Sequence, residues 1–348
     1  MARLQAQPEG TGPIFRNPAS ALACAAQLHG TRAALSCEKM TTVATIFLVV
    51  TGPGMSGRTH RSSIFLQDGR ILSSTAFPGD LFVLRVHAPL CARHAKPGSF
   101  AHIQCAPHLP MRRPLSIMRA NPQGEWIEFL FKAVGTGTRE LAKRSINDCI
   151  SVLGPIGNTF RAEQRYTRPL LLGGGVGIPP MIFLAEELKQ SSDFQPMVIM
   201  GSEVPFPFSY RPSKFLLPGI PEGVIAAMPL LEDWDIPSRL ASLQAYPGCY
   251  DGYLTDLGRI WIESVAEQDQ GSICIFACGP EPMLRAAADL AREFSIPCQI
   301  SMEEFMACAT GGCAGCVVKV QSRNGPAMKR VCVDGPVFDA RSIFTGQT

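Results

Sequence analysis

The sequence lacks any apolar run long enough to cross a membrane. Its longest apolar run near the N-terminus, Val43–Val50, is far shorter than the roughly 20 residues that span a bilayer. The sequence also lacks an excess of charge, because 32 basic and 29 acidic side chains leave a formal net charge of only +3, with no basic block. We therefore expect neither membrane insertion nor nucleic-acid binding.

The cysteine pattern of a disulfide-bonded secreted domain is also missing. The 13 cysteines are an odd number spread over 348 residues, and some lie in apolar stretches such as Ile273–Cys278. Disulfide frameworks are typical of short secreted chains, so this pattern indicates a reducing compartment and predicts a cytoplasmic protein. Eight cysteines are expected to be small core or surface residues: Cys24, Cys37, Cys91, Cys105, Cys149, Cys249, Cys274 and Cys298.

Length and composition predict a globular chain of more than one domain. The 348 residues exceed what one small core needs, and 46% hydrophobic with 18% charged residues is typical of soluble proteins. Residues 1–60 hold only Glu9 and Glu38 as acids, show no sustained periodicity, and are predicted to be a poorly ordered extension. An organelle transit peptide is the alternative interpretation of this acid-poor segment.

Residues 61–165 have the pattern of a small antiparallel β-barrel. Short β-rich runs alternate with turn-forming pairs such as Pro78-Gly79 and Gly154-Pro155. Several short strands at regular spacing with such breakers are typical of this fold. The runs are Asp80–Val86, Ser99–Cys105, Trp126–Val134 and Cys149–Leu153.

Residues 166–300 change to buried strands followed by helices, which predicts two βαβ units. An open parallel sheet with helices on its faces follows from this pattern, whereas the proline-rich segment 203–250 stays unassigned. Residues 301–348 form a small third domain. The predicted strands are Pro169–Leu172, Met197–Met200, Ser272–Ala277 and Pro297–Ser301, and the predicted helices are Met181–Leu188 and Glu281–Phe294.

Four cysteines near the C-terminus have the spacing of a metal site. Residues 308–316 read CATGGCAGC, which is a C-x4-C-x2-C pattern, and one further cysteine follows after 15 intervening residues. This is the plant-type spacing for four thiolates around a two-iron, two-sulfide (2Fe–2S) cluster. We predict Cys308, Cys313, Cys316 and Cys332 as the ligands.

The glycines of the cysteine loop suit the same interpretation. Gly311, Gly312 and Gly315 have no Cβ, so the backbone can wrap tightly and turn its N–H groups inward. A four-thiolate zinc site is the alternative, because thiolates also select zinc. Zinc sites usually use two C-x2-C pairs, which the spacing here does not match.

Two turns of the α/β half have the composition of nucleotide-binding loops. The first lies between a buried strand and a helix, where glycines let a pyrophosphate approach the backbone and the helix N-terminus. The second, ACGPEPML, follows a strand at its carboxyl end, where ligands of open α/β sheets bind. The candidates for nucleotide binding are Gly173, Gly174, Gly175, Gly177, Gly279 and Pro280, with Cys278 as the candidate catalytic residue.

The barrel half contains candidates for a second dinucleotide. The stretch MRRPLSIM places Arg113 and Ser116 on one strand, and FKAVGTGTREL adds Gly137 and Thr138. An arginine binds phosphate through two N–H groups, and a serine hydroxyl can reach a flavin ring atom. A Gly-Thr turn offers backbone donors to a pyrophosphate.

Together these motifs resemble the ferredoxin–NAD(P)⁺ reductase-like family, and within it the electron-transfer subunits of NAD-type dihydroorotate dehydrogenases. The similarity runs from about residue 75 to 340 and is most specific in SMEEFMACATGGCAGCVVKV and VCVDGPVF. The resemblance implies that the four cysteines hold the cluster and that FAD and NAD are the other cofactors. It implies FAD contacts from Arg113, Pro114, Leu115, Ser116, Leu130, Phe131, Lys132, Gly137 and Thr138.

The resemblance also implies a relay that serves pyrimidine biosynthesis. An FMN-containing catalytic subunit would oxidise dihydroorotate, and electrons would pass singly through the 2Fe–2S cluster to FAD and then as hydride to NAD⁺. The two kinds of subunit are expected to form a heterotetramer. Two alternatives stay open: a related reductase for a sulfide-, hydrogen- or ferredoxin-linked partner, and a redox sensor without catalysis.

Some positions qualify this resemblance. The family usually has glycine after the first cluster cysteine, whereas this chain has Ala309, a change that matters little if its φ is negative. Glu203, just past the second strand of the nucleotide unit, favours NAD over NADP because its carboxylate would repel a 2′-phosphate. Apolar side chains near the cysteines belong either to a partner interface or to the core: Phe305, Met306, Val317 and Val318.

Overall fold

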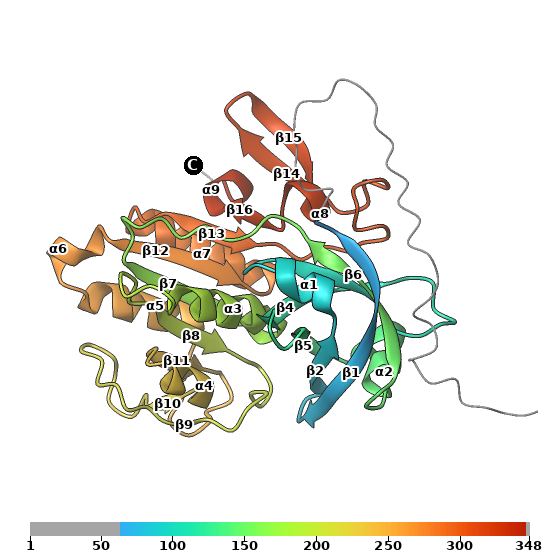
Figure 1. Ribbon diagram of the computed structural model, residues 1–348. Helices are drawn as coiled ribbons and strands as arrows, with labels where there is room; N and C mark the ends of the chain where they lie inside the picture. The colour runs from blue at the N-terminus through green and yellow to red at the C-terminus, as the bar shows by residue number, and fades with distance from the viewer. Residues whose placement is uncertain (1–62, 346–348) are drawn as a thin grey trace, which may run out of the picture. The chain divides into compact units, whose positions relative to one another are not determined.

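The computed structural model of the protein describes residues 63–345, so the predicted extension at residues 1–60 lies outside the described residues. Those that are described belong to one compact unit. They form a β-barrel, then a sheet flanked by helices, then a cysteine-bearing segment that returns to the sheet (Figure 1). The predicted fold class is confirmed.

Six antiparallel strands close the barrel in the order β1-β2-β5-β4-β3-β6. Between β1 and β2, Gly79 and Asp80 both have positive φ, of 80° and 59°, which suits the tight reversal of a hairpin. Two short helices lie in the connections between strands: α1 (Pro89–His94) between β2 and β3, and α2 (Thr136–Ala142) between β5 and β6. The strands are β1 (Phe65–Phe77), β2 (Leu81–His87), β3 (Phe100–Gln104), β4 (Arg113–Asn121), β5 (Trp126–Lys132) and β6 (Cys149–Ile156).

Strand β3 is buried on both of its faces. Ala101 and Ile103 pack inside the barrel with Phe129, whereas Phe100 belongs to a different core that it shares with the cysteine-bearing segment. Since alternate side chains of a strand point to opposite faces, His102 lies on the same outer face as Phe100. The outer face of the barrel at β3 is therefore covered.

The second sheet has the order β11-β8-β7-β12-β13-β16, and only its last pairing is antiparallel. Helix α3 (Ile178–Leu188) shares one core with the barrel residue Leu130, and α5 (Leu254–Ser264) and α7 (Glu281–Glu293) contribute to another. Both predicted βαβ units are present. The strands are β7 (Arg168–Gly174), β8 (Met197–Gly201), β11 (Ser238–Ala241), β12 (Ile273–Cys278), β13 (Cys298–Ser301) and β16 (Val337–Asp339).

The cysteine-bearing segment leaves the sheet after β13 and returns to it as β16. Between these strands lie a ribbon of β14 (Val317–Ser322) and β15 (Gly325–Arg330) and the short helix α8 (Val331–Asp334); α9 (Ala340–Ile343) follows β16. The predicted boundaries after residues 165 and 300 stay predictions.

The segment 203–250, unassigned from sequence, folds around a buried carboxylate. Glu232 accepts hydrogen bonds from the Ser213 hydroxyl and the Lys214 backbone N–H, both at 2.8 Å. The segment contains β9 (Arg211–Pro212), β10 (Ala226–Ala227) and α4 (Pro229–Asp233), and α6 (Glu267–Gln270) precedes β12. Among the helices of residues 63–345, none combines the length and the apolar character that a bilayer-spanning helix requires.

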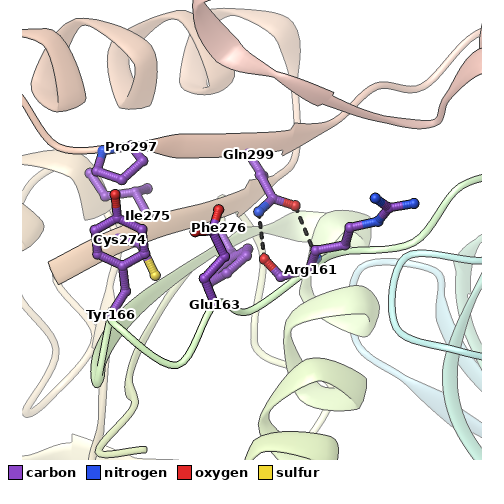
Figure 2. Close-up of a pocket in the computed structure, with 8 residues that line it drawn as sticks. All are labelled: Arg161, Glu163, Tyr166, Cys274, Ile275, Phe276, Pro297 and Gln299. Atoms are coloured by element: carbon purple, nitrogen blue, oxygen red, sulfur yellow. Dashed lines mark hydrogen bonds between the residues drawn. The ribbon is translucent and has the colours of Figure 1, made fainter. Parts of the chain in front are cut away.

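The linker from the barrel to the sheet is fastened to β13. The side-chain amide of Gln299 accepts a hydrogen bond from the Arg161 N–H at 3.0 Å and donates one to the Arg161 carbonyl at 2.7 Å (Figure 2). The small cavity beside this contact is lined by the first half of β12, including Cys274. It lies away from the turn after Cys278, so we do not assign the cofactors to it.

Candidate functional site

The four predicted ligand cysteines lie in two hydrogen-bonded pairs. The backbone N–H of Cys313 donates to the Sγ of Cys308 at 3.4 Å, and the N–H of Gly315 donates to the Sγ of Cys313 at 3.4 Å. The Sγ atoms of Cys316 and Cys332 are 3.3 Å apart. The loop thus turns backbone N–H groups toward sulfur, as the glycine content predicts.

This pairing suits a cluster with two irons. A 2Fe–2S cluster takes two thiolates at each iron, so four cysteines in two pairs match its ligand requirement. The arrangement therefore agrees with the ligand pattern of the iron–sulfur interpretation. Among residues 63–345, no group of three or more His, Cys, Asp or Glu side chains is placed to hold a single metal ion.

The thiols differ in how readily they lose a proton. Burial acts to raise the pKa of Cys308, but hydrogen bonds from Cys313 and Thr310 outweigh it and lower the pKa to about 6. Burial, followed by the hydrogen bond with Cys316, raises the pKa of Cys332. Since metal binding requires thiolates, loading the site must release a proton from Cys332.

The backbone of the cysteine loop takes conformations that favour glycine. Gly311 has φ of 86°, and two alanines, Ala309 and Ala314, have φ of 54° and 53°. Replacement of the family's glycine by Ala309 was expected to matter little if φ were negative, but φ at Ala309 is positive. The tight wrap of the loop imposes this conformation, although an L-residue there is strained.

The two predicted FAD segments meet at an arginine. A Cβ on Gly137 would lie 2.9 Å from the Nε of Arg113, so the guanidinium packs directly against the Gly-Thr turn. Among the described residues, Arg113 donates to the backbone carbonyls of the two residues before it, at 3.0 Å. The hydroxyl of Thr138 exchanges hydrogen bonds with the backbone of Gly135 at 3.2 Å.

The remaining FAD candidates divide between two faces of the barrel. Leu115 and Phe131 are buried inside it, so only their backbone can reach a ligand on the outer face. Leu130 packs with α3 on the other side. Three candidates are half-buried and remain accessible: Pro114, Ser116 and Lys132.

In the first nucleotide turn, one glycine is open to a ligand. Gly175 has φ of 55°, and a Cβ there would meet no heavy atom within 4 Å. Gly177 instead packs against the backbone of Cys278, and Gly174 and Gly279 pack against the Met283 sulfur. Close packing therefore accounts for Gly174, Gly177 and Gly279, and Gly173 packs in the same way against Ile178. Pro280, in contrast, is exposed.

Cys278 lies at the end of β12 with no exposed surface. Burial first, and then the charge of Glu303, raise the pKa of its thiol, while a hydrogen bond with Ser301 acts against them. The thiol is therefore neutral at physiological pH. Sequence reasoning missed Ser301 and Glu303, although both stand directly before the cysteine motif.

The chain is similar to several known proteins. Residues 303–344 match the iron–sulfur cluster binding domain of dihydroorotate dehydrogenase B. The electron transfer subunit of dihydroorotate dehydrogenase B from Caldanaerobacter subterraneus is 31% identical over 71% of this chain and 87% of its own length. The corresponding subunit from Shouchella clausii is 29% identical over 78% of this chain and 96% of its own length.

The chain belongs to the family of dihydroorotate dehydrogenase B electron transfer subunits.

In this family member all four candidate ligand cysteines lie within residues 303–344, the region that matches the iron–sulfur cluster binding domain. A structure of an NADH-dependent reduced ferredoxin-NADP oxidoreductase covers 83% of this family member, with a TM-score of 0.64 and 25% identity over 91% of its own chain. A ferredoxin reductase of carbazole 1,9a-dioxygenase, at 19% identity and a TM-score of 0.51, shares the fold over 67% of each chain.

Proposed function

We propose that this chain passes electrons between the catalytic subunit of a dihydroorotate dehydrogenase and NAD⁺, with a 2Fe–2S cluster and FAD as its cofactors. One observation carries the proposal. Phe100 on the outer face of β3 packs in one core with Met306 and Cys332 of the cysteine segment. Ser116 lies directly opposite Phe100, so the FAD motif and the cysteine segment share this face of the barrel.

The residues of the chain have distinct tasks in this relay. Arg113 holds the charged phosphates, Ser116 offers a hydroxyl to the ring system, and Gly175 lets a nucleotide approach the backbone. The neutral thiol of Cys278 lies directly before the second nucleotide turn, and the side chain of Glu303 is close enough to act on it. When bound, FAD supplies the exchange between single electrons and a hydride.

Exposed apolar side chains near the cysteines support a contact with a catalytic subunit in this region. Phe305 is 94% exposed and Met328 is 62% exposed, and Val317 also reaches the surface. Met306, in contrast, is buried and belongs to the core. We propose that the exposed three meet an FMN-containing partner in a heterotetramer, because large exposed apolar side chains are favoured at interfaces.

The test is an anaerobic assay with both subunits. Purified chain is expected to contain FAD and about two irons and two sulfides, and to reduce NAD⁺ when dihydroorotate and the catalytic subunit are added. Stoichiometric zinc without iron would refute the cluster. Both cofactors present, but no NAD⁺ reduction from dihydroorotate, would refute the proposed partner.

A second candidate function is electron transfer to another flavoenzyme. Its support is the 25% identity to the NADH-dependent reduced ferredoxin-NADP oxidoreductase chain over most of both molecules. Reduction of the chain by NADH together with no response to the dihydroorotate dehydrogenase subunit favours this candidate. If NADH does not bleach the flavin anaerobically, a redox sensor is favoured instead.

A further inference from the structure

His102 on β3 is a buried polar side chain that the relay described above does not use. Its exposed surface is 0%, and neither ring nitrogen has a hydrogen-bond partner among the described residues. Buried polar atoms are nearly always hydrogen-bonded, because an unpaired donor or acceptor retains its full desolvation cost. A structural explanation from packing alone is therefore insufficient for this imidazole.

The position of His102 joins the two cofactor segments. On β3 it lies directly opposite Pro114 of the predicted FAD motif, and directly opposite residues of an antiparallel pair share one face. The backbones of Arg112 and of Met306, two residues before Cys308, lie close enough to the ring to act on its pKa, although neither makes a hydrogen bond of good geometry with it. We call this contact region, formed by Phe100, His102 and Asn158 with Met306 and Gly335, the barrel–cluster joint.

One end of the barrel–cluster joint is already fixed by polar contacts. The backbone N–H of Asn158 donates to the Gly335 carbonyl at 2.6 Å, and its side-chain amide donates to the Asp334 carbonyl at 2.7 Å. These bonds hold the return of the segment after Cys332. At the start of the segment, before Cys308, the side chain of His102 lies near the backbone of Met306.

The surroundings keep the imidazole uncharged. Burial first, and then the positive charge of Arg112, lower the pKa of His102 to about 4. The Arg112 guanidinium is held next to it by hydrogen bonds to the His102 carbonyl at 3.1 Å and the Ser151 hydroxyl at 2.8 Å. A neutral imidazole has one N–H donor and one acceptor nitrogen, so it can bind across the joint without adding charge.

We propose that His102 is a positioning residue that fixes the entry of the cysteine segment on the flavin barrel through its neutral ring. In the loaded protein its N–H donates across the barrel–cluster joint and sets the separation and orientation of the cluster relative to the flavin. The inference rests on the proposed function, since it requires both cofactors.

The test compares His102→Leu and His102→Phe with His102→Asn in the full chain, loaded anaerobically. Leucine and phenylalanine remove the donor, whereas asparagine keeps a donor and an acceptor. Ile103→Val is the matched control, because it loosens the opposite, inner face of the same strand. The readouts are flavin and iron content, the magnetic interaction between the reduced cluster and one-electron-reduced flavin, and the rate of electron transfer between them.

Leucine and phenylalanine are expected to leave both cofactors bound, weaken the magnetic interaction and slow the transfer about tenfold, because small displacements of reacting groups cost large factors in rate. Asparagine is expected to restore most of both. A wild-type interaction and rate in either apolar variant, or the same losses in Ile103→Val, would overturn the inference. Absence of flavin and iron from the wild-type chain would overturn the proposed function instead.

Discussion

Two alanines of the cysteine loop have backbone conformations that favour glycine. Ala309 is buried and Ala314 is exposed, yet both have positive φ. At Ala309 glycine would relieve the backbone but remove a buried methyl group, and the two effects oppose each other. Because Ala314 is exposed, glycine there would relieve the backbone strain without removing a buried methyl group.

Ala314→Gly is expected to stabilise the folded chain by about 1 kcal/mol, because glycine adopts positive φ without steric cost. Urea unfolding of the loaded protein measures the change. Ala307→Gly is the matched control, since Ala307 is exposed and is not among the residues with positive φ. We expect that control to lose stability; a loss in both variants would contradict the strain argument.

Two glycines near the start of α2, of which only Gly137 packs against Arg113, separate ligand binding from stability. Gly137→Ala places a methyl group 2.9 Å from the Arg113 Nε, so the guanidinium must move, and FAD affinity is expected to fall about tenfold. Alanine favours the helix, so stability is not expected to fall. Gly135→Ala, where a Cβ would meet nothing within 4 Å, should bind FAD normally in the same titration.

His102 gives the chain a pH-dependent stability. Its folded pKa of about 4 lies below the ordinary value of 6.5, so as pH falls the unfolded chain takes up the proton first. Stability is therefore complete above pH 6.5 and is lost as pH falls toward 4, by up to about 2 kcal/mol between pH 7 and 5. Urea unfolding of the cofactor-free chain at both pH values measures it. His102→Asn should show a smaller difference, and an equal one would count against this origin.

At the scale of elements, a bidentate ion pair joins barrel strand β4 to helix α3 of the nucleotide sheet. Arg119 on β4 donates to both carboxylate oxygens of Glu186 on α3, at 2.7 to 3.3 Å, and stacks near Trp126 and Trp234. Both charged side chains are only about one-fifth exposed. The geometry is bidentate, which makes this pair stronger than an ordinary surface pair.

Glu186→Gln is expected to destabilise the chain by about 1 kcal/mol, because it leaves a partly buried guanidinium with a weaker acceptor. The next residue offers the control. Glu187 contacts Lys96 at 3.8 Å with both side chains well exposed, so Glu187→Gln should change stability by less than about 0.5 kcal/mol. Equal effects in thermal unfolding would show that the Arg119 contact is not special.

Four barrel strands, four strands of the second sheet and two of the helices could be predicted from local pattern, because apolar alternation and turn residues act within a few neighbours. Helix Met181–Leu188, for example, lies within α3. The segment 203–250 could not be predicted, because its prolines interrupt any hydrophobic periodicity and its fold depends on hydrogen bonds to the buried Glu232. Helix α5 and the return of the chain as β16 were also not predicted.

At the scale of the whole molecule, the FAD candidates lie in the barrel half of the chain and the cluster candidates lie in the cysteine segment. Cys313→Ser is expected to abolish iron binding while FAD content stays near that of the unchanged chain, because none of the FAD candidates lies in the cysteine loop. Iron analysis and flavin absorbance measure the two contents. Cys249→Ser, at a half-buried cysteine outside the loop, should keep both cofactors. Loss of FAD in Cys313→Ser would argue against separate sites.

The sequence by itself determined the fold class and the candidate ligands Cys308, Cys313, Cys316 and Cys332, because spacing along the chain is enough to mark a tight metal loop. The individual site residues stay predictions. Only the tertiary structure decided which groups share the barrel–cluster joint, the neighbours of Cys278, and the φ values of the two alanines. His102 and Met306 are about two hundred residues apart, and such contacts depend on long-range packing that no local pattern encodes.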